Sequence, residues 1–72
     1  MYPEFQKKLG KRIKTMREDK GISQQELASL CDFEKSNMSR IEAGRTNPTI
    51  GTLLKISNAL NINVTILVDV ES

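Results

Sequence analysis

The side chains best suited to covalent or metal chemistry are almost absent from this sequence. It contains no histidine and a single cysteine, Cys31, among 72 residues. Without histidine the most common general base is missing, and the usual His and Cys ligand sets for zinc cannot be assembled. Cys31 lies in an apolar run, where a buried and unreactive thiol is the simplest interpretation. We therefore expect no enzyme activity, no metal and no cofactor.

Hydrogen-bonding side chains instead gather in residues 34–43, on the side of the expected helix opposite Met38 and Ile41. They are Lys35, Ser36, Ser39 and Arg40. Lysine and arginine offer positive charge and several N–H donors, and serine hydroxyls both donate and accept. Such a face can bind a hydrogen-bonding or anionic partner, but a solvated helix face has the same composition. The surrounding elements must decide between the two.

The composition is that of one soluble globular domain. Hydrophobic residues make up 38% and charged residues 28% of the chain. Neither a membrane-length apolar run nor the apolar core of a signal peptide is visible, so we expect a cytoplasmic protein. A chain of this length buries only about 60% of its unfolded surface, so a partner should add stability.

Positive charge is concentrated near the N-terminus. The net charge is +2, from 11 Lys or Arg and 9 Asp or Glu residues. Residues 1–20 hold seven basic and three acidic side chains, while residues 21–47 and 48–72 each hold one more acid than base. This asymmetry permits an anionic partner, although a solvated basic helix face also accounts for it.

Apolar spacing and capping residues predict the first two helices. Residues 3–20 should form an amphipathic helix that ends at Gly21, a residue suited to the left-handed conformation. Ser23 and Glu26 form a capping-box pattern that marks the start of the second helix. The apolar side chains of the first helix are Phe5, Leu9, Ile13 and Met16.

Two further helices are expected after a turn at Asp32. The third should run over residues 34–43 and end at Gly44, again by a left-handed residue. Thr49 is a suitable N-cap for the fourth. Its expected inward side chains are Ile50, Leu53, Leu54, Ser57 and Leu60.

In the C-terminal tail the spacing of apolar residues changes from a helical period to strict alternation. In residues 64–70, β-branched side chains alternate, with Val64, Ile66, Val68 and Val70 on one side. This pattern favours a β-strand. A lone strand needs a partner for its backbone groups, so we expect antiparallel pairing with the same strand of a second copy. The alternative is a fifth short helix that docks Val64, Leu67 and Val68.

Residues 24–43, QQELASLCDFEKSNMSRIEA, combine features needed by two short helices that cross steeply. Ala28 is small at the crossing, and Leu27 and Cys31 are apolar towards the core. This pattern resembles the phage repressor and Cro class of helix-turn-helix proteins, the XRE family, over roughly residues 7–62. The segments that carry the resemblance are ISQQELASLC, SNMSRIEAG and NPTIGTLLKISNAL.

The sequence departs from the family pattern at two positions. Asp32 stands where the turn usually has glycine, and aspartate tolerates the left-handed region better than most residues. Glu34 stands where the third helix usually has a Ser, Thr or Asp cap. Glu34 is a weaker cap and places a carboxylate beside the DNA face that the resemblance implies.

The resemblance implies an all-α domain of four to five helices whose third helix enters the major groove of double-stranded DNA. It gives Gln24, at the start of the second helix with Ser23, contacts to backbone and bases. Lys35 and Arg40 match positions that can donate to guanine, and Ser36 and Ser39 are versatile short-range partners. Contacts to phosphate are expected from Asn37, Arg45, Thr46 and Asn47.

The resemblance also implies one structural ion pair. Arg17, near the end of the first helix, and Glu42, near the end of the third, match positions that pair in similar repressors. If this pair is buried, loss of one partner leaves the other charge stranded.

Specificity argues for a homodimer on a pseudo-palindromic operator. One recognition helix reads few base pairs, and phosphate contacts alone give a dissociation constant of only about 10⁻⁴–10⁻⁶ M. We expect a DNA-binding domain over residues 1–63 and a dimerisation tail over residues 64–72. The residues expected in the dimer contact are Leu60, Ile62, Val64, Ile66 and Val68.

A transcriptional regulator, acting as a repressor or controller, is the function that this reading predicts. The alternatives are an antitoxin that binds both operator DNA and a toxin protein, and a protein-interaction module that does not bind DNA. No membrane partner and no small-molecule effector are expected, because few residues remain for an effector domain.

Overall fold

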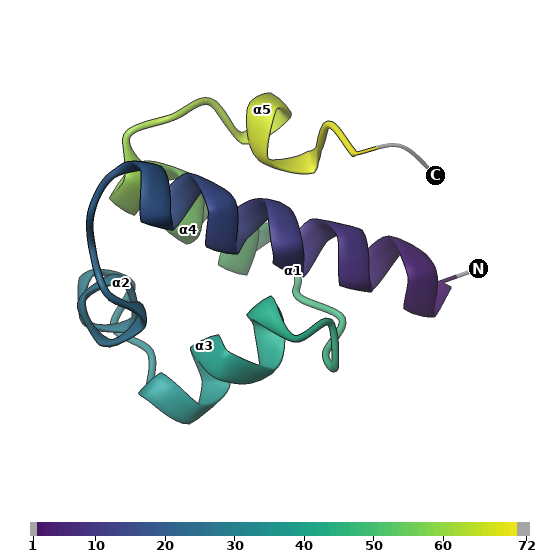
Figure 1. Cartoon of the computed structure of the whole chain (residues 1–72), viewed down its shortest axis with the longest axis horizontal. Helices are drawn as coiled ribbons and strands as arrows, with labels where there is room; N and C mark the ends of the chain where they lie inside the picture. The colour runs from purple at the N-terminus through teal and green to yellow at the C-terminus, as the bar shows by residue number, and fades with distance from the viewer. Residues whose placement is uncertain (1, 71–72) are drawn as a thin grey trace.

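The computed structural model describes residues 2–70, which form five helices. They are α1 (Tyr2–Asp19), α2 (Gln24–Leu30), α3 (Lys35–Glu42), α4 (Ile50–Leu60) and α5 (Val64–Val68). In Figure 1, α1 runs across the middle of the molecule, with α3 below it and α5 above it. None of the helices within the described range is long and apolar enough to span a membrane.

All five helices contribute to one hydrophobic core. Side chains from α1, α2, α3 and α4 meet there, and Leu67 of α5 closes it with no exposed surface. The largest side chains that are fully buried are Ile13, Leu27, Met38, Ile56, Leu60 and Leu67. The apolar spacing of α1 and α3 thus correctly identified much of the core.

The helix ends follow from residues that adopt the left-handed conformation. Gly21, Asp32, Gly44 and Asn61 have φ values of 71°, 61°, 75° and 57°. After each, the next N–H donates back to a carbonyl five residues earlier, as in the bond from Phe33 N to Ala28 O of 2.8 Å. Three of these ends were expected from the sequence, and Asn61 was not.

The N-terminal caps of α2 and α4 are also as predicted. The Ser23 hydroxyl accepts from the Glu26 backbone N–H at 3.0 Å, and the Ser23 N–H donates to Glu26 Oε1 at 2.8 Å. These bonds to Ser23 lower the pKa of the exposed Glu26 carboxyl, the backbone bond most of all. The Thr49 hydroxyl accepts from the Thr52 N–H at 3.1 Å.

The inward face of α4 agrees with the prediction at Leu53, Ser57 and Leu60 but not at Ile50 and Leu54. Ile50 and Leu54 were expected inside but are 76% and 45% exposed, while Ile56 is fully buried. The buried row is Leu53, Ile56, Ser57 and Leu60, a regular helical stripe. The prediction was wrong for Ile50, which begins α4 before the helix reaches the core, and for Leu54, which lies beside the buried stripe.

The C-terminal β-strand is not present, and its prediction was wrong. Residues Val64–Val68 form α5, which is capped by the Asn63 side chain accepting from the Thr65 N–H at 3.0 Å. A helix satisfies its own backbone, whereas a strand here would need a second chain. The spacing of Val64, Leu67 and Val68 fits one helix face, and burial of Leu67 against α1 and α4 outweighs β propensity.

Candidate nucleic-acid interface

The turn between α2 and α3 sets these helices at a fixed angle. Asp32 adopts positive φ, and its N–H donates to Ser29 O at 3.1 Å. Ala28, only 1% exposed, lies in the contact between α2 and α3, where a small side chain permits close approach. The aspartate therefore fills the turn position without breaking the geometry.

Helix α3 has one buried side and one polar side. Met38 and Ile41 are 0% and 4% exposed and anchor α3 in the core. The exposed polar residues on the other side are Lys35, Ser36, Ser39 and Arg40. Asn37 is half-buried at the edge of this face. The structure thus gathers these residues on one accessible surface, as the spacing predicted.

Glu34 begins α3 without the usual side-chain cap. Its backbone is extended, with φ −76° and ψ 149°, and its carboxylate makes no capping hydrogen bond. Its carbonyl accepts from the Asn37 and Met38 N–H groups. The exposed carboxylate is therefore free beside the polar side of α3.

Arg17 and Glu42 form the ion pair implied by the resemblance, and Gln24 joins it. Arg17 Nε donates to Glu42 Oε2 at 2.8 Å, and Arg17 Nη2 donates to Glu42 Oε1 at 3.1 Å. Gln24 Nε2 donates to the same Oε1 at 3.0 Å, and Arg17 Nη1 donates to Ile22 O at 2.9 Å. One carboxylate thus connects α1, α2 and α3.

The ion pair is largely removed from water. Arg17 and Glu42 are each 8% exposed. The hydrogen bonds to Glu42 raise the pKa of the Arg17 guanidinium despite the opposing effect of burial. The pair therefore holds Gln24 beside the polar side of α3, in a position that the sequence alone could not establish.

Lys14 lies at this surface, although sequence reasoning did not include it. It borders a hollow of about 210 Å³ together with Gln24, Ser39, Glu42 and Ala43. Lys14 falls at the edge of α1 next to α3, on the opposite edge from Arg12. The sequence did contain a signal: Lys14 lies three residues before Arg17 and seven after Lys7, spacings that put side chains on the same face of a helix.

The segment after α3 continues the same surface. Arg45 and Asn47 are exposed, and Thr46 is half-buried. The Arg45 N–H donates to Arg40 O at 2.9 Å, which ties this segment to the end of α3. Ser23 lies next to Gln24 at the start of α2, with its hydroxyl engaged as the α2 cap.

Gly10 is the second residue that sequence reasoning missed. A Cβ atom at this position would lie 2.5 Å from both Ile41 O and Glu42 O. Only a glycine lets α1 pass so close to the backbone of α3. A glycine in the middle of an amphipathic helix was the available signal, since it lowers helix propensity and needs a packing reason.

Two short helices joined by a tight turn, the second with an accessible polar side, define a helix-turn-helix unit. The helix-turn-helix family model HTH_3 matches residues 13–67. The chain belongs to this family, which confirms the resemblance to the XRE-type proteins.

Curated relatives carry regulator names. The transcriptional regulator SinR of Bacillus subtilis is 44% identical over 62 residues, which cover 85% of this chain and 56% of SinR. An immunity repressor of Bacillus phage phi105 is 34% identical over 64 residues, covering 89% of this chain and 44% of the repressor. The chain thus spans about half the length of these relatives.

Solved structures share the fold. The restriction-modification controller protein C.AhdI from Aeromonas hydrophila aligns with a TM-score of 0.83 at 34% identity, covering 85% of this chain and 92% of that one. A hypothetical transcription factor, NHTF, from Neisseria aligns with a TM-score of 0.88 at 26% identity, covering 97% and 80%. Both alignments include most of the five-helix body.

Proposed function

We propose that this protein is a transcriptional regulator that binds specific DNA sequences by placing α3 in the major groove. The observation that carries the proposal is the accessible polar side of α3, which is held on a buried apolar side and tied to α1 and α2 by Glu42. The family and the names of its regulator and repressor relatives support it.

The side chains of α3 have distinct roles in this proposal. Lys35 and Arg40 donate to guanine O6 and N7. The hydroxyls of Ser36 and Ser39 both donate and accept, so they can bond to either donors or acceptors on the base edges. Glu34 offers an acceptor for a cytosine amino group and repels sites that lack one. Together these side chains supply base readout from one face of one helix.

Contacts to the DNA backbone surround this face and set its register. Gln24 and Ser23 contact the DNA backbone from the start of α2. Lys14 adds a positive charge from the neighbouring edge of α1. Asn37 meets phosphate from the side of α3. The remaining backbone contacts come from the segment after α3, through Arg45, Thr46 and Asn47.

Homodimerisation by helix packing completes the proposed binding mode. The helical α5 gives no support to strand pairing, and Leu60 is 1% exposed within the core. Ile62, Val64 and Val68 are half-buried. Apolar side chains available for contact remain on α4 and α5, where Ile50, Leu54 and Ile66 are 76%, 45% and 41% exposed.

The test is selection of bound sequences from random duplex DNA, with the Arg40→Ala variant beside the unmodified protein. We expect an inverted repeat with half-sites about 34 Å apart, because a two-fold dimer presents two copies of α3. The variant should lose preference at one position in each half-site, at about 1–3 kcal/mol of discrimination.

Lys11→Ala is the control, because Lys11 lies outside the polar side of α3 and its hollow. It should leave the selected sequence unchanged. Weak binding without sequence preference in all three proteins would instead favour a protein-interaction module. The relatives are named as regulators and repressors and lend no support to the antitoxin alternative.

A further inference from the structure

The side-chain amide of Gln24 has its orientation fixed by the buried ion pair. Gln24 Nε2 donates to Glu42 Oε1 at 3.0 Å, and both oxygens of that carboxylate accept from Arg17. A carboxylate paired with arginine accepts hydrogen bonds and donates none. The reversed amide would place the oxygen of Gln24 against Glu42, with two acceptors facing each other. Glu42 therefore holds the amide nitrogen and turns Oε1 away from itself.

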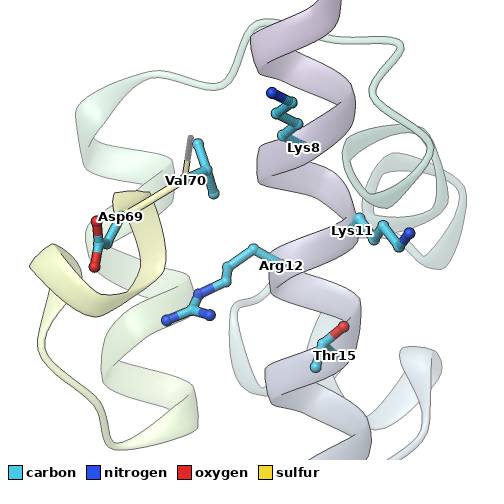
Figure 2. A pocket seen from close by; sticks show the side chains of 6 residues that line it. All are labelled: Lys8, Lys11, Arg12, Thr15, Asp69 and Val70. Carbon is cyan, nitrogen blue, oxygen red and sulfur yellow. The ribbon is translucent and has the colours of Figure 1, made fainter. Parts of the chain in front are cut away.

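The carboxylate that holds Gln24 is itself fixed in place. Arg17 and Glu42 are each 8% exposed, and two hydrogen bonds join them. The other arginine of α1, Arg12, does not share this role. Figure 2 shows the Arg12 side chain reaching from α1 towards α5, where its Nε donates to Ile66 O at 3.1 Å. One arginine thus serves the interface, and the other serves the packing of α5.

The carbonyl oxygen of Gln24 is accessible to a ligand. Within residues 2–70 it accepts no hydrogen bond from another protein group, and this part of the chain has no buried side-chain oxygen or nitrogen without a partner. Oε1 is therefore in contact with solvent. Gln24 shares its hollow with Ser39, which belongs to the polar side of α3. A free acceptor thus lies at the edge of the surface that we expect to face DNA.

We propose that Glu42 is a positioning residue for DNA recognition, because it makes Gln24 present an acceptor to the major groove. Gln24 Oε1 accepts from the amino group of adenine or cytosine at the edge of each half-site. Guanine and thymine carry an oxygen there, which leaves both acceptors without a partner. The second N–H of Gln24 remains available to the DNA backbone. This inference rests on the proposed placement of α3 in the groove and adds a specificity-determining contact to it.

The experiment repeats the selection of bound duplexes with Glu42→Gln and Gln24→Ala, and with Gln25→Ala as the control from the next, exposed position of α2. A glutamine at position 42 still offers its oxygen to Arg17 and turns its amide nitrogen towards Gln24. The amide of Gln24 then reverses and presents its own nitrogen. Circular dichroism verifies folding. The Gln24→Ala variant keeps both bonds between Arg17 and Glu42 and so tests the contact even where Glu42→Gln is unstable.

We expect the unmodified protein to prefer adenine or cytosine by about tenfold at one position of each half-site, since the other bases leave two acceptors unpaired. The Gln24→Ala variant should lose this preference, and Gln25→Ala should keep it. Glu42→Gln should reverse it towards guanine or thymine. A purely structural role of Glu42 would instead weaken binding to all sequences alike, without a change of preferred base.

A second measurement does not depend on DNA. In the nuclear magnetic resonance spectrum of the free protein, one Nε2 proton of Gln24 should be shifted downfield by its bond to the carboxylate, and Glu42→Gln should remove this shift. An amide that resonates like a solvated glutamine would overturn the inference. So would an inverted repeat that Gln24→Ala binds with every preference intact. Failure of the unmodified protein to select any repeat would overturn the proposed function itself, and this inference with it.

Discussion

Glu42 bonds to two side chains that lie 25 and 18 residues earlier in the sequence. It accepts from Arg17 in α1 and from Gln24 in α2, at distances between 2.8 and 3.1 Å. A buried pair of this kind contributes less by its attraction than its disruption costs, because an isolated buried charge is expensive. Substitutions at the two glutamates near the ends of α3 should therefore change the free energy of unfolding by very different amounts.

Glu42→Ala should lower the free energy of unfolding by up to about 3–5 kcal/mol, since it strands the Arg17 guanidinium. Glu34→Ala, at the N-cap of the same helix, is the matched control, because the Glu34 carboxylate is exposed and makes no capping bond. Thermal unfolding followed by circular dichroism compares the two. Equal melting temperatures would contradict a structural role for the pair.

A comparison of Lys14 and Lys11 variants distinguishes a direct DNA contact from a general effect of positive charge. Both are exposed lysines of α1, but only Lys14 borders the hollow beside Gln24 and Ser39. Lys14→Ala should reduce the slope of log binding constant against log salt by about 0.9, the effect of one lost phosphate contact. Lys11→Ala should leave the slope unchanged. Equal changes in both would remove Lys14 from the interface.

At the scale of elements, the helix ends are set by local chemistry. Each of α1 to α4 ends at a residue with positive φ followed by a backward N–H bond. Gly21 and Gly44 adopt this conformation without strain, and Asp32 and Asn61 are among the few other residue types that tolerate it. These short-range preferences made the boundaries of α2 and α3 predictable.

The crossing of α1 and α3 is set by Gly10. Gly10→Ala should destabilise the protein by about 1–3 kcal/mol, because its Cβ would lie 2.5 Å from two backbone carbonyls of α3. This loss must exceed the gain of up to about 1 kcal/mol from alanine's helix propensity.

Gly51→Ala is the control for that prediction. Gly51 also lies in a helix, but the nearest atom to its added Cβ is Thr49 Oγ1 at 3.8 Å. This variant should be neutral or more stable, by up to about 1 kcal/mol. Denaturant unfolding of both variants gives the comparison, and a stabilising Gly10→Ala would refute the close approach.

For the whole molecule, α5 bears on the proposed dimer. Its Leu67 is fully buried and belongs to the protomer's own core, whereas Ile66 is 41% exposed. In the proposed dimer, Leu67 therefore serves folding and its neighbour Ile66 serves the contact between copies. The expected dimer contact is apolar and formed by helix surfaces.

Ile66→Glu should shift the protein towards a monomer in sedimentation velocity and leave its helical circular dichroism intact. Leu67→Ala should instead lower the free energy of unfolding by about 2–5 kcal/mol, as expected for a buried leucine. A variant with Glu at position 66 that remains dimeric at the same concentration would place the contact elsewhere.

Much of this protein is determined by its sequence alone. Local capping preferences and the apolar period of α1 and α3 predict four helices, their turns and the polar side of α3. The helix-turn-helix family follows from the spacing of small, apolar and polar residues between Gln24 and Ala43. These features act over one or two helical turns, so they are visible in a linear chain.

Only the tertiary structure decided the remainder. A β-branched tail became α5 because its Leu67 fills a core built by distant helices, a gain that local propensity does not contain. The contact of Gly10 with α3 and the sorting of α1 lysines onto two sides likewise depend on how the helices pack. Which side chains are buried, and on which side of the molecule each charge lies, depends on how the helices pack together. Residues far apart in the chain determine that packing.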